Sequence, residues 1–350
     1  MSRFSFFARR RPACLGAPSS QSGYVLIFVM AALALTAFVA ARFALRIDAL
    51  REQALAMQAH AEARRVVEGA KARALYWVTT RPIGLASLGF ADEEALRLDG
   101  RLYQMNEGVL ASFQDARGLL TLNAPQRGRF VSMLMGAGGS FDQASALFDV
   151  LLDYTDADNL RRLNGAEAPD YAAAGLPPPR NDWVLSTDET ARMVHWAASP
   201  ELRTRVQPWL SLSRIEHFNP NTAPLELLRL LWPKTTAEQW ERFDLLRRQA
   251  PFANGSAALA ATGIGFDVAD ETLLFHASNE LRLQLWAPGL PMALEYNLMI
   301  LPTGDFAPWL IQEVRQSNRL AIPDAQEAIA KFPDASKAIA RPPSSAMPDL

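Results

Sequence analysis

The longest apolar stretch of the chain lies near its N-terminus, where the eighteen residues from Tyr24 to Ala41 carry no charge. A helix needs roughly 17 to 25 apolar residues to cross a bilayer, whereas a removable secretory signal has a core of roughly 7 to 15. The pattern therefore predicts a membrane-spanning helix that is retained. The basic residues before it place the N-terminus in the cytoplasm by the positive-inside rule.

Helical periodicity continues beyond the apolar stretch. Residues 42–78 contain no Pro and one Gly, and are rich in Ala, Leu, Arg and Glu, which favour helix. We expect one helix from about Tyr24 to about Thr79, ended by Arg81-Pro82 and Gly84. Its apolar positions recur at spacings of three and four and predict a packing face made of two runs: Phe43, Ile47, Leu50, Ala54, Met57 and Ala61, then Ala63, Val67, Ala70, Ala74 and Trp77.

Strand patterns occur in two separate groups. The first, Gly100 to Asn123, alternates apolar and polar residues around turns at 106–108 and 115–118. The second comprises Leu281–Trp286, Leu294–Leu301 and Trp309–Arg315, and the sequence between the groups is mainly helical. We therefore expect an α+β fold in which a large inserted α-helical domain interrupts an antiparallel sheet. The expected segments are 24–80 for the transmembrane and stalk helix, 81–123 and 276–316 for the two parts of the sheet, 124–275 for the insertion, and 317–350 for a flexible tail with a short helix near Gln326 to Lys331.

Composition narrows the chemistry. The net charge of -2 gives no general case for nucleic-acid binding. Cys14 is the only cysteine and precedes the apolar stretch, so the chain after that stretch has no disulfide, thiolate metal site or cysteine nucleophile. The four histidines are scattered, and no nucleophile-elbow or phosphate-loop pattern occurs. We predict no catalytic residue and a protein that is not an enzyme.

Acidic residues gather in "LFDVLLDYTDADNLRRLNGAEAPDY", residues 147–171. A short helix from Leu147 to Asp153 leads to further carboxylates, at positions 156, 158, 167 and 170. Crowded carboxylates repel one another unless a cation lies among them, and Ca²⁺ takes 6 to 8 oxygen ligands in flexible geometry. The residues alone leave two interpretations: a Ca²⁺ site, or a solvated acidic loop partly neutralised by Arg161 and Arg162.

A helix-hairpin-helix pattern follows. In "FNPNTAPLELLRLL", residues 218–231, Asn and Thr precede a Pro-initiated helix and predict an N-terminal cap. With "ALAATGIG" at 258–265, the stretch resembles a tandem helix-hairpin-helix fold. The alternative function is therefore a membrane-anchored DNA-binding or DNA-uptake protein. A structural role is favoured, because the first hairpin lacks Gly and acidic residues balance Arg242, Arg247 and Arg248.

A basic leader, a Gly before an apolar segment and one long helix together resemble the type IV pilin and pseudopilin class. The resemblance implies a leader of residues 1–23, cut by a prepilin peptidase between Gly23 and Tyr24, and methylation during processing. Phe28 stands where most pilins have Glu. In that class the Glu neutralises the terminal amine of a neighbouring subunit, so a subunit with nothing above it would not need the carboxylate.

Three motifs behind this anchor, "LLDYTDADNLRRLNGAEAPDY", "LSTDET" and "FNPNTAPLELLRLL", resemble the family of type II secretion system protein K, the large minor pseudopilin, over roughly residues 20 to 315. The resemblance implies a role at the pseudopilus tip with the I and J minor pseudopilins. It also implies a single inner-membrane span in membrane lipid, with the C-terminal domain in the periplasm of a Gram-negative cell. Structural Ca²⁺ would be held by Asp156, Asp158 and Glu167, with Asp153 and Asp170 as weaker candidates.

Overall fold

The computed structural model describes residues 22–90, 94–266, 270–317 and 329–333. Its first element, helix α1, runs from Ser22 to Thr80 and confirms the long helix predicted from the sequence. The chain divides into two units, Met1–Ala59 and His60–Leu350, and the last turns of α1 belong to the second. The first unit is therefore helical throughout its described part, and the second contains the sheet and the insertion.

In the second unit the last turns of α1 pack on the sheet. The second predicted apolar run, Ala63 to Trp77, is buried at each of its five positions, and Val67 and Ala74 have no exposed surface. These side chains share a core with Phe113, Leu283 and Leu298 of the strands. The helix ends where Pro82 has no N–H to continue it. The second of the two predicted runs is thus a packing face, whereas the large apolar side chains of the first run, Phe43 to Met57, are exposed.

Six strands form the sheet, in the order β10-β3-β4-β7-β8-β9. Neighbouring strands run antiparallel, except that β10 is parallel to β3. Phe113, Leu283 and Tyr296 lie opposite one another on β4, β7 and β8, and form one row of the core. The strands are β3 Asp99–Gln104, β4 Leu110–Asp115, β7 Glu280–Trp286, β8 Ala293–Ile300, β9 Trp309–Ser317 and β10 Ala330–Lys331.

Both predicted turns in the first strand group are present as short 3-10 helices, η1 Asn106–Gly108 and η2 Ala116–Gly118. In η1 both Glu107 and Gly108 have left-handed backbone, with φ of 57° and 76°, which reverses the chain between β3 and β4. A hairpin of two further short strands, β1 Ser87–Leu88 and β2 Leu96–Arg97, precedes β3.

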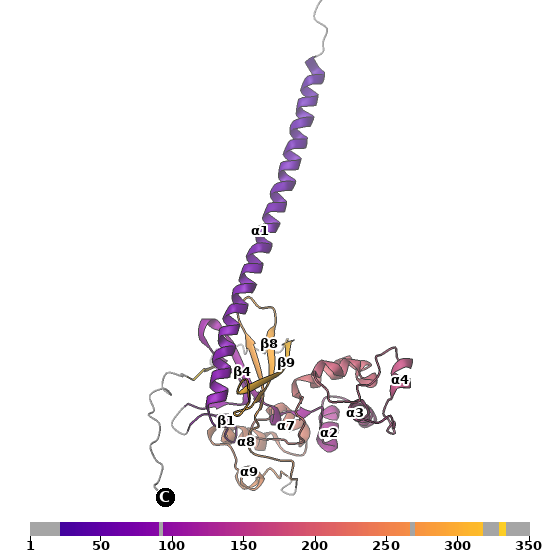
Figure 1. Cartoon of the computed structure of the whole chain (residues 1–350), viewed down its shortest axis with the longest axis vertical. Helices are drawn as coiled ribbons and strands as arrows, with labels where there is room; N and C mark the ends of the chain where they lie inside the picture. The colour runs from indigo at the N-terminus through magenta and orange to yellow at the C-terminus, as the bar shows by residue number, and fades with distance from the viewer. Residues whose placement is uncertain (1–21, 91–93, 267–269, 318–328, 334–350) are drawn as a thin grey trace, which may run out of the picture. The chain divides into compact units, whose positions relative to one another are not determined.

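Residues 116–279 leave the sheet after β4 and return at β7, so the sheet is interrupted by an insertion as predicted. In Figure 1 helices α8 and α9 lie below the strands and α2, α3 and α4 beside them. The insertion has its own apolar core, which includes Phe130, Leu147, Trp196 and Trp240. Its elements are β5 Leu120–Thr121, α2 Arg127–Gly136, α3 Phe141–Thr155, α4 Ala168–Ala173, η3 Thr187–Arg192, α5 Val194–Ala197, α6 Pro200–Val206, η4 Gln207–Trp209, β6 Leu210–Ser211, α7 Leu225–Leu231, α8 Ala237–Gln249 and α9 Gly255–Thr262.

Asp115, at the end of β4, joins the insertion to the sheet. Its side chain has no exposed surface. Oδ1 accepts hydrogen bonds from the N–H groups of Arg117 and Ser278 and from Ser278 Oγ, at 3.1, 3.0 and 2.7 Å. Oδ2 accepts from Thr222 Oγ1 at 2.8 Å and from Asn219 Nδ2 at 3.3 Å. One carboxylate therefore binds the chain where it leaves the sheet, where it returns, and in the loop before α7.

The predicted side-chain cap of helix α7 is wrong. The N-cap position is Pro224, and no side chain caps the helix. Asn221 instead donates from Nδ2 to the carbonyls of Phe252 and Phe275, at 2.8 and 3.2 Å. The capping prediction considered only the local sequence, whereas buried carbonyls and the Asp115 carboxylate compete for the same polar side chains.

Part of the predicted tail is also wrong. Ala330 and Lys331 form strand β10 beside β3, where a helix was expected. Phe332 is 3% exposed and packs against the rings of Trp77, Tyr103 and Phe113. One aromatic side chain therefore docks this segment in the sheet core. The remaining parts of the predicted tail and helix, residues 318–328 and 334–350, lie outside the described residues.

Candidate functional site

The acidic loop connects helices α3 and α4. Helix α3 ends at Thr155, with Asp156 as its C-cap residue, and Glu167 is the N-cap residue of α4. Asp153, in the last turn of α3, is completely buried. Because Asp153 and Asp156 are three residues apart, they lie on the same side of the helix end. The fold thus brings Asp153 and Asp156 together through Arg162, and Glu167 lies near enough to feel their charges.

A close backbone approach shapes this loop. A Cβ atom at Gly165 would lie 1.8 Å from Asp153 Oδ2, so any other residue there would clash with the carboxylate. Glycine lets the returning chain pass directly over Asp153. Gly165 therefore has a specific role, which is to let the loop close over the buried aspartate.

Arg162 is the cation that this structure places among the carboxylates. Its Nη1 lies 2.5 Å from Asp153 Oδ1 and 2.5 Å from Asp156 Oδ2, and its backbone N–H donates to Asp153 Oδ2 at 3.1 Å. The Arg162 side chain is 37% exposed, while that of Asp153 is fully buried. The guanidinium therefore reaches the cluster from the solvent side.

The charge of the cluster exceeds what Arg162 neutralises. Both carboxylate oxygens of Glu167, and Oδ1 of Asp156, are buried and have no hydrogen-bond partner. Burial, with the nearby charges of Asp153, Asp156 and Asp158, raises the pKa of Glu167 above its ordinary value. A buried carboxylate without a partner is costly, and a divalent cation supplies what it lacks. The donor set consists of hard oxygens, which suits Ca²⁺.

Two of the predicted metal ligands lie differently. Asp158 is exposed, and its Oδ1 accepts from the N–H of Leu160 at 2.8 Å. Asp170 accepts from the N–H of Glu167 at 3.0 Å and pairs with Arg161 at 3.1 Å, so its carboxylate serves to start α4. Asp153, a weaker candidate from the sequence, lies at the centre. In the arrangement described, no three His, Cys, Asp or Glu side chains within residues 22–90, 94–266, 270–317 and 329–333 are close enough to hold one ion.

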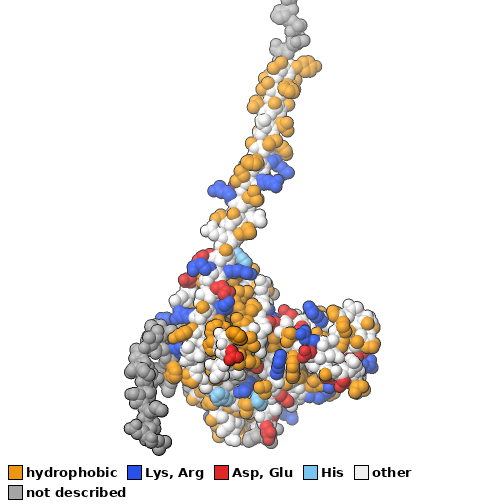
Figure 2. Space-filling view, viewed as in Figure 1, with side chains coloured by type: hydrophobic (Ala, Val, Ile, Leu, Met, Phe, Trp, Pro, Cys, Tyr) orange, Lys and Arg blue, Asp and Glu red, His pale blue; other side chains and the backbone are white. Residues whose placement is uncertain are grey.

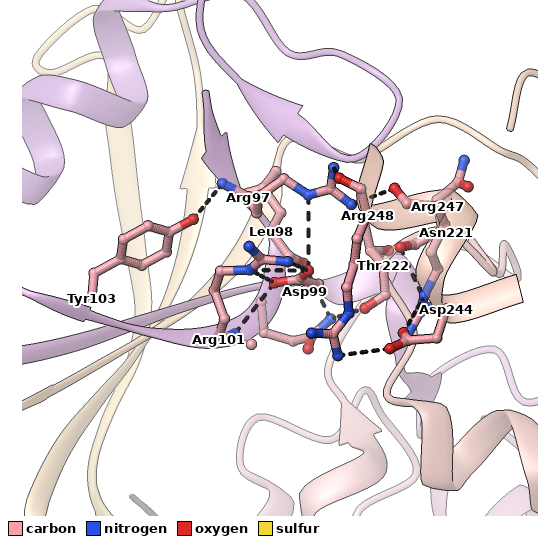
Figure 3. Close-up of polar contacts among 12 residues, drawn as sticks. Arg97, Leu98, Asp99, Arg101, Tyr103, Asn221, Thr222, Asp244, Arg247 and Arg248 are labelled. Carbon is pink, nitrogen blue, oxygen red and sulfur yellow. Dashed lines mark hydrogen bonds and ion pairs between the residues drawn. The ribbon is translucent and has the colours of Figure 1, made fainter. Parts of the chain in front are cut away.

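The helix-hairpin-helix region uses its basic residues within the protein (Figure 3). Arg247 is 5% exposed and donates to the carbonyls of Pro220 and Ala223, at 2.8 and 2.7 Å. Arg247 and Arg248 both pair with Asp244 at 2.7 Å. These contacts fix α8 against the loop before α7, which favours the structural role predicted for the region over DNA binding.

Arg97, just before β3, adds a second joint between sheet and insertion (Figure 3). Its guanidinium donates to the carbonyls of Arg247 and Arg248, at 2.7 and 3.3 Å, in the last turn of α8. A cation at a helix C-terminus satisfies free carbonyls and complements the helix dipole. Sequence reasoning missed this contact, since residues 150 positions apart meet only in the folded chain.

The apolar part of α1 forms the other candidate site. The helix is long and apolar enough to cross a membrane. Tyr24 and Phe28 are 83% and 76% exposed, and Figure 2 shows apolar side chains along both visible sides of the first turns. The proposed cleavage junction, Gly23-Tyr24, lies in the first turn of α1.

Comparison with known proteins agrees with these features. Residues 108–214 match the family model for protein K of the type II secretion system. The fold is similar to that of a chain in the crystal structure of the GspK-GspI-GspJ complex from the enterotoxigenic Escherichia coli type 2 secretion system, with 15% sequence identity and a TM-score of 0.50. That similarity covers 78% of this chain and 100% of the other. The search of curated proteins gives no match. Residues 108–214 therefore resemble protein K of the type II secretion system, and the fold resembles that of the solved chain.

Proposed function

We propose that this protein caps the tip of the pseudopilus and initiates its assembly during export of folded proteins across the outer membrane. The observation that carries the proposal is the insertion of residues 116–279 into a pilin-like sheet packed on a long apolar helix. The insertion has its own core and is as large as a typical whole domain. A subunit of that size fits an end position better than a repeated one. The proposed role is structural and requires no catalytic residue.

The proposed partners are the I and J minor pseudopilins of the same system. The solved structure with the same fold is titled as a complex of GspK with GspI and GspJ, which supports this choice. Helix α1 offers the contact surface, since Phe43, Leu50 and Met57 of its first predicted run are 66%, 57% and 67% exposed.

Co-purification tests this partnership. Cells that make this protein together with the I and J minor pseudopilins are solubilised in detergent. The tagged full-length protein is expected to co-purify with both I and J. Replacing Leu50 by Asp should reduce recovery, because a charge then faces an apolar contact. The control Glu52→Gln changes a polar residue nearby and should retain both. Absence of I and J from the wild-type eluate would contradict the assembly proposal.

The proposed processing is cleavage between Gly23 and Tyr24 by a prepilin peptidase, followed by methylation of the new N-terminus. The mature helix would then anchor in inner-membrane lipid, with the second unit in the periplasm. Intact-mass measurement from peptidase-positive cells decides the matter. A mature chain beginning after Ala41, or an uncut chain, would contradict it. The Gly23→Val variant should remain uncut, since the junction then lacks glycine.

The acidic loop is proposed to hold a structural Ca²⁺ through Asp156, Asp158 and Glu167, with Asp153 and Asp170 as further candidates. Bound Ca²⁺ would neutralise the carboxylates and fix the end of α3 to the start of α4. The unpartnered buried oxygens of Glu167 support this assignment. An ion at about 100 times its Kd stabilises the folded state by about 2.7 kcal/mol. Removing Ca²⁺ with EDTA should therefore lower the melting temperature of the wild type. In Asp158→Ala the melting temperatures with Ca²⁺ and with EDTA should be nearly the same. An unchanged wild-type melting curve in EDTA would refute the site.

A further inference from the structure

A cavity of about 260 Å³ lies between the sheet and the insertion. Ser112 and Gln114 of β4 line it, and they alternate along the strand with Phe113, whose ring lies in the core shared with α1. Because successive side chains of a strand point to opposite faces, the cavity is on the face of the sheet that α1 does not cover. The insertion supplies the other wall through Trp209 of η4 and Pro224 just before α7. Sheet and insertion therefore form this cavity together.

The charges that line the cavity are already paired within the protein. Asp99 pairs with Arg101 at 2.7 Å, and Glu295 pairs with Arg315 at 2.7 Å. The remaining carboxylate of the lining, Glu226, is exposed to solvent. A charged ligand would have to break these pairs, which is costly for buried groups. The lining therefore favours a ligand that has no net charge.

The lining also offers both donors and acceptors to a neutral ligand. Arg282 is 6% exposed, and its Nε is buried 3.4 Å from Glu295 Oε1 with no hydrogen-bond partner. Gln284 Nε2 donates to Glu295 Oε2 at 2.7 Å, and Ser112 Oγ donates to Gly100 O at 2.8 Å. The amide oxygen of Gln284 and the hydroxyl oxygen of Ser112 therefore keep lone pairs for further donors. A hydroxyl group suits such a lining, because it donates and accepts at the same atom.

Trp209 gives the cavity an apolar wall. Its side chain is half-buried, packs on the core of the insertion and lines the cavity. An aromatic ring packs well against the C–H groups on one face of a sugar ring, while polar side chains bind the hydroxyls. The volume lies below the range of about 300–1,000 Å³ that is usual for drug-sized ligands, so the cavity has room for one ring.

We propose that this cavity binds one pyranose ring of a neutral saccharide. The ring packs on Trp209, and its hydroxyls hydrogen bond to Arg282 and Gln284. Since both sheet and insertion supply contacts, the bound sugar also strengthens the joint between them. The inference does not depend on the position of the subunit in the pseudopilus.

The test is saturation-transfer NMR of the full chain in a detergent without a sugar headgroup. Maltotriose and chitotriose are the probes, and they distinguish glucose from N-acetylglucosamine as the source of the ring. Binding of either is expected with a Kd on the order of 1 mM, as fits a small ligand with few contacts. Trp209→Ala should weaken binding at least about tenfold, and so should Gln284→Met, which keeps the side-chain length and removes the amide.

Trp183→Ala is the matched control. Trp183 is 39% exposed, stacks on Arg214 and lies outside the cavity lining, so its loss should change the Kd by less than about twofold. A melting curve shows whether Trp209→Ala is folded, and Gln284→Met carries the test if it is not. Failure of both saccharides to bind at about 50 mM would overturn the proposal. It is also overturned if Trp183→Ala weakens binding as much as Gln284→Met, or if Gln284→Met binds as wild type does, because the sugar then binds elsewhere.

Discussion

Replacing Asp115 by Ala should weaken the connection between the insertion and the sheet. The carboxylate is completely buried and accepts five hydrogen bonds from four residues, Arg117, Asn219, Thr222 and Ser278. These residues come from the start of the insertion, from the loop before α7, and from the return to β7. Removing the carboxylate therefore breaks the joint at all three points together.

The size of the effect follows from the donors left behind. The hydroxyls of Thr222 and Ser278 also reach the carbonyls of Asn219 and Glu280, at 3.3 and 2.9 Å. Asn219 Nδ2 also donates to Leu85 O at 3.1 Å. We therefore count only the backbone N–H groups of Arg117 and Ser278. A hydrogen bond to a charged group contributes about 1.5–3 kcal/mol, so Asp115→Ala should cost about 3–6 kcal/mol of unfolding free energy.

Thermal unfolding followed by tryptophan fluorescence measures this loss. For a domain of this size, about 2 °C per kcal/mol gives a decrease in melting temperature of about 6–12 °C. The control Asp305→Ala changes an exposed turn residue between β8 and β9 and should stay within about 0.5 kcal/mol of wild type. If Asp115→Ala and the control Asp305→Ala have the same melting temperature, the Asp115 carboxylate does not hold the insertion and the reasoning is refuted.

Three further predictions concern other buried groups. Burial opposes ionisation of Glu295, but Arg282 and Arg315 hold its pKa below the ordinary value of a glutamate, so its ionised form stabilises the fold at neutral pH and that stability is lost as the pH falls through the lowered pKa. From about pH 6 to about pH 3, the melting temperature of Glu295→Gln should therefore fall less steeply than that of the control Glu226→Gln. Equal slopes would contradict this prediction. Phe332→Ala should cost about 3 kcal/mol in urea unfolding, because the ring packs on three aromatic side chains, and a loss below about 0.5 kcal/mol would mean that β10 is not anchored there. The pKa of Glu167 is raised, so its ionised form destabilises the fold at neutral pH. In EDTA at pH 7, Glu167→Gln should have a higher melting temperature than wild type, and added Ca²⁺ should no longer raise that temperature. A lower melting temperature in EDTA would show that the carboxylate has a partner.

The periodic parts of the fold were predictable from the sequence. Helix α1, the turns at 106–108 and 115–118, and the strands on both sides of the insertion follow from local patterns that packing reinforces. The cap of α7 and the helix near Lys331 were wrong because distant partners decide these segments. Asn221 bonds to residues 31 and 54 positions away, and Phe332 fills a gap in an aromatic core. A single sequence contains no local signal for either contact.

The acidic loop was predictable as a cluster of charges and only partly as an arrangement. The sequence identified the carboxylates and both arginines, but ranked Asp153 below Asp158. In the structure Asp153 is buried at the end of a helix under Gly165, while Asp158 lies in the exposed loop. The spacing of Asp153 and Asp156 on α3 was the available signal, because residues three apart share a helix face.

Labelling of isolated pseudopili tests the central proposal most directly. With a tag placed in the turn that contains Asp305, which is exposed, gold-labelled antibody should mark one end of each filament and leave the shaft bare. The prediction rests on the size of the insertion, residues 116–279, which has its own core. Label repeated at regular intervals along the shaft would contradict the tip assignment.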